Sequence, residues 1–217
     1  MTTAAGLSRR HVLKWAGATT GIMVAGAMLP NFGISAALAA DLGEGDVGVL
    51  NYAYALEQLE AAFYTQVIAT PFNKMQANDQ LILTQIRDHE IAHRDFLKGA
   101  LGRNAIPDLE VDFSAVDFSS RKSVLGTAEV FENLGVAAYN GAGQLIRNVD
   151  YLAAAGSIVS IEARHAAAIS DLIKAYSKDT VGKQVDKLGL DGALLPSQVL
   201  PQAAPFIITP VTANSLA

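Results

Sequence analysis

The chain of 217 residues contains no cysteine, and this absence excludes several classes of protein at once. Disulfide bonds, metal sites with thiolate ligands, iron–sulfur clusters, a rubredoxin-type iron centre and a lipid-anchored N-terminal cysteine all require cysteine. Charged side chains are also scarce, at 17% of all residues, and tryptophan occurs once. A metal site in this chain would therefore use oxygen and imidazole ligands, and a charge inside an apolar stretch calls for an explanation.

Residues 1–39 have the features of an export signal that is removed from the mature protein. The run SRRHVLK at 8–14 resembles a twin-arginine motif, with Val12 where phenylalanine is more usual. An apolar stretch follows, and the run Ala37-Leu38-Ala39 fits a small-x-small cleavage site before Ala40. A retained membrane anchor is the alternative, since the stretch is long enough to span a bilayer. We expect cleavage, export by the twin-arginine translocase and a periplasmic or secreted protein, because that route often carries folded proteins with a metal already inserted.

Cleavage would make the chain more acidic. Residues 1–39 hold Arg9, Arg10 and Lys14 and no acid, so their removal changes the net charge from −5 to −8. An acidic surface disfavours binding to nucleic acid and to anionic membranes. We therefore expect no nucleic-acid partner.

Two copies of one pattern organise the remaining chain. Each copy has a lone glutamate, a tyrosine seven residues later and, 33 or 30 residues after that glutamate, a Glu-x-x-His run. The first copy consists of Glu57, Tyr64, Glu90 and His93. The second copy consists of Glu132, Tyr139, Glu162 and His165. Four carboxylates and two imidazoles on four helices form a ligand set for two metal ions that share bridging carboxylates.

Apolar residues at helical spacing surround both copies and predict an all-α four-helix bundle. We expect helices over residues 46–70, 78–101, 123–146 and 149–177, with Asn78 as an N-cap and Gly102 as a C-terminal stop. The third helix contains four glycines, which predict close approach of a neighbouring backbone: Gly126, Gly135, Gly141 and Gly143.

Two segments break the helical period. Residues 103–122 contain proline and serine and predict a long crossover between helices two and three, held down by Phe113 and Phe118. Residues after 178 are irregular but apolar, and we expect them to pack along the bundle with a short helix at Pro196–Leu200. The predicted organisation is a signal peptide at 1–39, a bundle at 40–178 and a C-terminal extension at 179–217.

The spacing within each Glu-x-x-His run suits metal binding. Residues i and i+3 lie on one helical face, so Glu90 with His93, and Glu162 with His165, can offer an oxygen and a nitrogen to one metal. Glu57 and Glu132 would then be terminal ligands. A charge in such apolar stripes costs several kcal/mol unless it is paired or binds a metal. A solvated surface pair is the alternative interpretation for a single run, but two matched runs favour coordination.

Two neighbouring acids remain open as ligands. Glu60 follows Glu57 by three residues, and Glu129 precedes Glu132 by three, so either could face the site. The shared seven-residue offset to tyrosine favours Glu57 and Glu132. His89 should point about 100° away from Glu90 and lie at the rim or surface.

The two tyrosines should lie on the core side of their helices. Residues seven apart return to nearly the same face, so Tyr64 and Tyr139 should stand above their own lone glutamates. They are candidates for hydrogen bonds to the ligands or for electron donors to an oxidised metal pair.

The chain resembles the ferritin-like superfamily, and within it an exported bacterial group similar to desiccation-related proteins. The resemblance lies in LNYAYALEQLEAAFY, IRDHEIAHRDFLKGALG, FENLGVAAYNGAGQLI, SIVSIEARHAAAI and DGALLPSQVLPQAAPFI. It implies an up-down-down-up four-helix bundle. It also implies di-iron positions at Glu57, Glu90, His93, Glu132, Glu162 and His165. Missing rubredoxin-like cysteines exclude a complete rubrerythrin.

These features predict an exported di-metal carboxylate protein, with iron as the first expectation and manganese as the second. O₂ or H₂O₂ would be the substrate of ferroxidase or peroxide-consuming chemistry that protects against oxidative or drying stress. One alternative is a non-catalytic protective protein whose metals stabilise the bundle, and another is a di-manganese catalase-like enzyme. We expect a monomer or small oligomer with two metals, and not a large iron-storage cage.

Overall fold

A computed structural model describes residues 39–175, 182 and 184–216. The expected twin-arginine motif and nearly all of the expected signal peptide lie outside these residues. Within the described residues, no helix is both long enough and apolar enough to cross a membrane.

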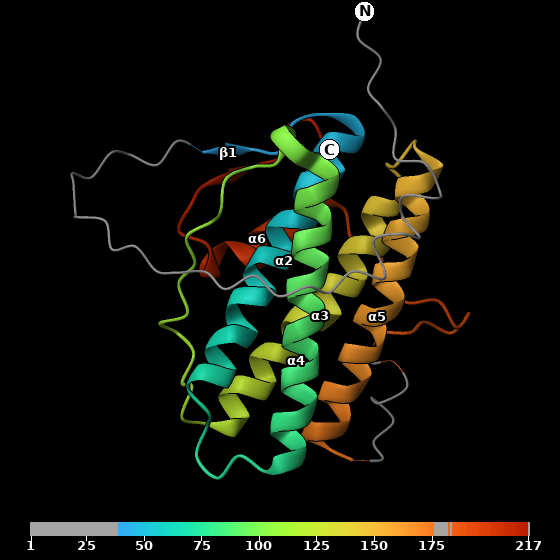
Figure 1. Ribbon diagram of the computed structural model, residues 1–217. Helices are drawn as coiled ribbons and strands as arrows, with labels where there is room; N and C mark the ends of the chain where they lie inside the picture. Colours follow the sequence, from blue (N-terminus) through green and yellow to red (C-terminus); the bar gives the residue numbers. More distant parts are fainter. Residues whose placement is uncertain (1–38, 176–181, 183, 217) are drawn as a thin grey trace, which may run out of the picture.

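Four long helices form the body of the described protein (Figure 1), as the sequence predicted. They are α2 (Gly45–Ala69), α3 (Ala77–Leu101), α4 (Arg121–Gly143) and α5 (Val149–Ile173). Their apolar residues point inward and build one core, which includes a cluster of edge-to-face rings around Phe63. The helix ends agree with the predicted ends to within four residues.

Helix ends follow local chemistry. Ser120 and Asn148 cap α4 and α5, since each side chain accepts a hydrogen bond from a backbone N–H in the first turn. The expected cap at Asn78 is wrong: α3 begins one residue earlier, and the backbone N–H of Gln76 donates to the carboxylate of Asp79 there. Gly102 ends α3 with a φ of 55°, a left-handed value that glycine adopts readily.

The connections define an up-down-down-up bundle. Helices α2 and α3 form one packed pair, and α4 and α5 form the other. After the short 3₁₀ helix η1 (Gly102–Asn104), the segment 105–120 runs the length of the bundle in Figure 1. Phe113 and Phe118 of this crossover pack on Phe63 with ring centroids 5.7 and 6.0 Å away, as predicted. Glu57, Glu90, Glu132 and Glu162 thereby reach one interior region from four different helices.

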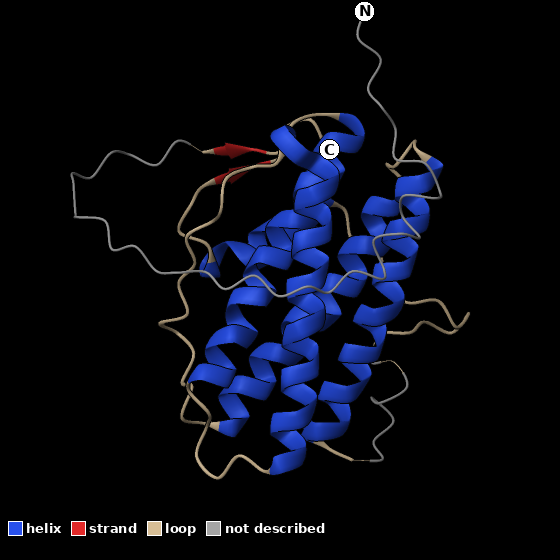
Figure 2. Ribbon diagram, in the orientation of Figure 1, coloured by secondary structure: helices blue, strands red, loops and turns tan. Residues whose placement is uncertain are grey.

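The C-terminal extension packs on the bundle, as predicted. Its helix α6 (Pro196–Ala203) is three residues longer than expected, and η3 (Ala204–Phe206) follows. The short strands β1 (Ala40–Asp41) and β2 (Val211–Thr212) pair in parallel, and Figure 2 shows them beside the helical body. The backbone N–H of Leu194 donates to the carbonyl of Ala137 on α4 at 2.9 Å. The extension therefore covers α4 instead of trailing into solvent.

The glycines of α4 serve different purposes. A Cβ at Gly141 would collide with the backbone of Leu194, which confirms the predicted close approach at this position. A Cβ at Gly135 would instead meet carboxylate oxygens of Glu162 and Glu60, at 3.0 and 3.3 Å. No described atom lies within 4 Å of a Cβ at Gly126, so no close approach explains that glycine.

Candidate metal centre

The structure brings the six predicted ligands together in the middle of the bundle. Each of the four long helices contributes one glutamate, and α3 and α5 each add a histidine one turn later. Glu90, Glu132 and Glu162 are fully buried, and Glu57 and His165 are nearly so. The side chain of His93 is 12% exposed, which makes it the most accessible member of the set.

The first group of possible ligands consists of Glu57, Glu90, His93 and Glu162, each with one donor atom within 4.8 Å of the others. Nδ1 of His93 lies 3.1 Å from Oε1 of Glu162, 3.4 Å from Oε2 of Glu57 and 3.5 Å from Oε2 of Glu90. Three carboxylate oxygens therefore surround one imidazole nitrogen, which suits the coordination of one cation.

The second group consists of Glu90, Glu132, Glu162 and His165. Nδ1 of His165 lies 2.7 Å from Oε1 of Glu90 and 3.3 Å from Oε2 of Glu132. Glu90 and Glu162 belong to both groups, whereas Glu57 and Glu132 belong to one each. Glu90 and Glu162 could therefore bind two cations at once, whereas Glu57 and Glu132 could each bind one.

The unsatisfied atoms test whether these residues fit a metal pair. Within the described chain, nine buried side-chain atoms lack a hydrogen-bond partner, and eight of them belong to the six predicted ligands. They are Glu57 Oε2, both Oε atoms of Glu90 and Glu162, Glu132 Oε2, and Nδ1 of His93 and His165. The close N···O contacts between these histidines and glutamates lack hydrogen-bond geometry. The carboxylate oxygens and imidazole nitrogens therefore face one another without a hydrogen between them. Buried polar groups are rarely left in this state, and bound cations would satisfy them.

The electrostatics agree with this interpretation. Burial alone would lower the pKa of His93, but the surrounding carboxylates of Glu162, Glu57 and Glu90 outweigh it and raise this pKa to about 12. Burial and the charge of Glu57 raise the pKa of Glu162 to about 7. Burial, with the charges of Glu162 and Glu57, also holds the pKa of Glu90 well above its usual range. Without cations the centre must therefore hold protons that metal binding would displace.

The two tyrosines donate hydrogen bonds to the ligand carboxylates, but across the bundle. The hydroxyl of Tyr64 on α2 donates to Oε1 of Glu132 on α4, and that of Tyr139 on α4 donates to Oε1 of Glu57 on α2. Both tyrosines are buried two turns along from the lone glutamate of their own helix, as expected, and each hydroxyl reaches the glutamate of the opposite helix. These two hydrogen bonds link α2 to α4 at both ends of the centre.

The two alternative acids lie in different surroundings. Glu60 is only 5% exposed. Its pKa lies well above normal, first because the carboxyl group is buried and then because the charges of Glu162, Glu132 and Glu57 act on it. It is absent from both ligand groups, however, since none of its oxygens lies within 4.8 Å of every donor atom in either group. Glu129 is half-buried on α4 and is also outside both groups. The geometry favours Glu57 and Glu132 over these neighbours.

His89 plays a part that the sequence did not reveal. It is exposed, as predicted for a rim residue, but its ring stacks on His165 at a centroid distance of 5.2 Å. Its Nδ1 lies 2.9 Å from Nε2 of His165. A proton on Nε2 of His165 would leave Nδ1 free to bind a metal. The equivalent residue of the second copy is Ile161, so the doubled pattern carried no signal for this contact.

Other charged residues near the runs face outward. Arg164 is exposed, and Arg87 and Arg94 pair with their sequence neighbours Asp88 and Asp95 at the surface. A solvated charged face therefore lies beside the buried centre.

Comparison with known proteins adds one match. A family model described as a ferritin-like domain matches residues 45–175, which is more than half of the chain and includes all six predicted ligands. No curated protein matches the chain.

Proposed function

The chain belongs to the ferritin-like domain family, and from this premise we propose that it is an exported di-metal carboxylate protein that oxidises iron(II) or consumes peroxide. The observation that carries the proposal is the set of eight unpartnered buried donor atoms on Glu57, Glu90, His93, Glu132, Glu162 and His165. Iron is the preferred metal and manganese the alternative, because carboxylate and imidazole ligands suit both.

The proposed ligands would have different roles in the two metal sites. Glu90 and Glu162 would bridge, Glu57 and His93 would complete one metal site, and Glu132 and His165 would complete the other. Two iron(II) ions held there would supply two electrons, which with two protons reduce O₂ to H₂O₂ or H₂O₂ to two waters.

The protein's own part is to bind, orient and exclude water. Tyr64 and Tyr139 hold the terminal glutamates by hydrogen bonds from opposite helices, and His89 orients the ring of His165. Burial of the carboxylates keeps bulk water away, which strengthens their attraction for a cation. These contacts would fix the ligands before metal arrives.

Export is part of the proposal and rests on the sequence alone. The twin-arginine motif at 8–14 and the small residues at 37–39 support a signal peptide that is removed near Ala40. Strand β1 begins at this residue, and its N–H donates to the carbonyl of Pro210 at 2.7 Å. We expect N-terminal sequencing of the exported protein to start at or near Ala40.

Anaerobic iron loading tests the chemistry. Mature protein with two equivalents of iron(II) should develop ferric absorbance on addition of O₂ or H₂O₂ faster than buffer with the same iron. Glu162→Gln should abolish this reaction, whereas Glu129→Gln, on α4 but outside both groups, should retain it. Oxidation no faster than in buffer would contradict the enzymatic proposal. Two retained metals without turnover would instead support the protective role in which metals stabilise the bundle.

A further inference from the structure

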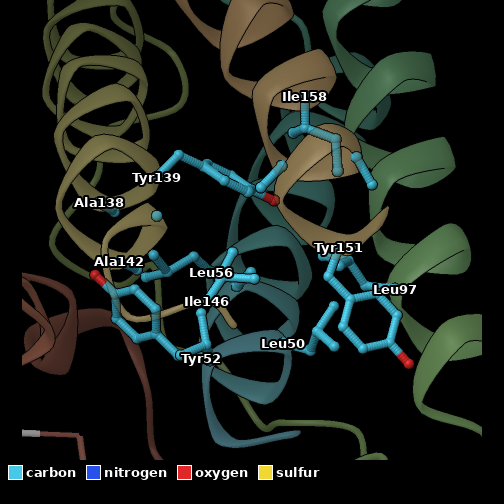
Figure 3. A pocket seen from close by; sticks show the side chains of 15 residues that line it. Leu50, Tyr52, Leu56, Leu97, Ala138, Tyr139, Ala142, Ile146, Tyr151 and Ile158 are labelled. Carbon is cyan, nitrogen blue, oxygen red and sulfur yellow. The ribbon is translucent and has the colours of Figure 1, made fainter. Parts of the chain in front are cut away.

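An apolar cavity lies inside the bundle beside the metal centre (Figure 3). Helices α2, α4 and α5 supply most of its wall, together with Leu97 of α3. One wall is the ring of Tyr139, whose hydroxyl bonds to Glu57. A single phenol ring therefore separates the cavity from a proposed ligand.

The lining offers almost no hydrogen bonds. Most of the wall is aliphatic, and small residues open the space: Ala53, Ala138, Ala142, Ala154 and Ala155. The hydroxyl of Tyr139 is already used by Glu57, and in Figure 3 that of Tyr151 points away from Ile158. Tyr52 has the one buried lining hydroxyl without a partner among the described residues. Water or H₂O₂ needs two to four partners, so the cavity disfavours both.

The size of the cavity limits its occupant. About 20 Å³ is open to the centre of a water-sized molecule, which is little more than the roughly 10–15 Å³ that one such molecule requires. An alkyl chain or an aromatic ring would not fit without movement of the helices. The space suits a diatomic apolar molecule.

The cavity extends from near the surface to the ring of Tyr139. Ile146, Tyr151 and Ala155 of its wall are half-buried, near the turn between α4 and α5. Leu56, Tyr139 and Ile158 at the inner part are buried. The wall thus runs from the edge of the bundle to the phenol that holds Glu57.

We propose that this cavity admits and holds O₂, and so makes O₂ rather than H₂O₂ the oxidant that approaches the centre from the Tyr139 side. The inference rests on the proposed function, because it names the oxidant of that same centre. It adds a binding site for a small apolar gas, built by residues that belong to neither ligand group.

Xenon binding to metal-free protein tests the site without any turnover. Wild-type protein should bind one xenon per chain, seen by ¹²⁹Xe NMR or in xenon-pressurised crystals between Tyr139 and Ile158. Ala154→Leu should lose this binding, since the added side chain fills the space. Ala153→Leu makes the same change at the exposed neighbour on α5 and should keep it. Absence of xenon from wild-type protein would overturn the proposal, whatever the variants do.

The kinetics of iron oxidation provide a second test of the cavity. With two irons bound, Ala154→Leu should slow oxidation by O₂ roughly tenfold, as a blocked passage does, and leave oxidation by H₂O₂ nearly unchanged. The milder Ala154→Val should give an intermediate rate and serves if the larger residue disturbs folding. Equal O₂ rates in wild type and both variants would refute the cavity while leaving the di-metal function intact. Failure of the wild type to oxidise iron with either oxidant would refute the function itself.

Discussion

The α2–α3 half and the α4–α5 half of the bundle carry the same pattern but do not build the same environment. Each half supplies a lone glutamate, a tyrosine seven residues on and a Glu-x-x-His run, and each tyrosine bonds to the glutamate of the other half. Up to this point the halves are interchangeable. Two positions break the equivalence, and both place the additional polar group on the α2–α3 half.

The first difference lies three residues after each lone glutamate. The α2–α3 half has Glu60 there, which is buried, whereas the α4–α5 half has Gly135. A Cβ at Gly135 would lie 3.3 Å from an oxygen of Glu60 and 3.0 Å from one of Glu162. A side chain at residue 135 would thus occupy space that carboxylates now use, so one half provides a carboxylate and the other provides room for it.

The second difference lies one residue before each Glu-x-x-His run. His89 of α3 contacts His165 of α5, while Ile161 in the equivalent position supplies no such nitrogen. His165 is therefore oriented by a neighbour, and no equivalent described contact orients His93. The comparison teaches that a symmetric ligand set can hold two inequivalent metals, and we expect them to bind with different affinities.

The largest effect is expected from a shared ligand. Glu162→Gln should reduce the metal content from two ions per chain to nearly none, because Glu162 belongs to both groups and its amide would lack the charge. Elemental analysis after dialysis measures this, with Glu129→Gln as the control that keeps both ions. Retention of one ion by Glu162→Gln would contradict its bridging role.

Substitution of a terminal ligand should remove the metal site of one half and leave that of the other. Glu57→Gln and Glu132→Gln should each leave about one tightly held ion, because each glutamate belongs to one group only. Titration with manganese(II), followed by electron paramagnetic resonance, should show one remaining site in each variant with a different affinity. Identical affinities would show that the two halves are equivalent after all.

Acid should release the metals. A proton on Glu162, whose pKa lies at about 7 without metal, competes with binding, and the proton on His93, with a pKa of about 12, must be displaced at any physiological pH. Affinity should therefore fall as pH drops below about 7, by roughly tenfold per unit for each additional proton. Calorimetry in buffers of different ionisation enthalpy counts the released protons. An affinity independent of pH between 5 and 8 would exclude these groups as ligands.

The rim histidine should affect one metal only. His89→Phe removes the nitrogen that faces His165, and loss of such a partner lowers metal affinity by about tenfold or more. The weaker binding should appear at the site that survives in Glu57→Gln and should be absent in Glu132→Gln. Ile161→Phe is the matched change on α5. Weakening of both sites to the same degree would mean that His89 acts on the fold and not on His165.

The tyrosines should show the smallest effect and the closest symmetry. Tyr64→Phe and Tyr139→Phe each remove one hydrogen bond to a terminal glutamate, and since a bound metal would neutralise that carboxylate, the loss should be about 1 kcal/mol, or roughly fivefold in affinity. Both variants should keep two metals, with a lower affinity at the site of Glu132 or of Glu57 respectively. If each variant instead weakened the site of the glutamate on its own helix, the crossed arrangement would be wrong.

Much of this architecture was predictable because local pattern and burial agree. The helices follow from apolar residues at helical spacing, and the six ligands stand out because charges interrupt otherwise apolar faces. The crossed tyrosine contacts were not predictable, since helical spacing relates Tyr64 to Glu57 and says nothing of Glu132. The contact between His89 and His165 and the cavity beside Tyr139 depend on how helices far apart in sequence pack.

The most direct test of the central claim is the metal content of mature protein purified from its native export route. Elemental analysis together with the mass of the assembly should find two ions of iron or manganese per chain in a monomer or small oligomer. Both ions should be lost in Glu162→Gln. A protein that binds no metal, or a very large particle with many irons per chain, would contradict a di-metal centre built from these six residues.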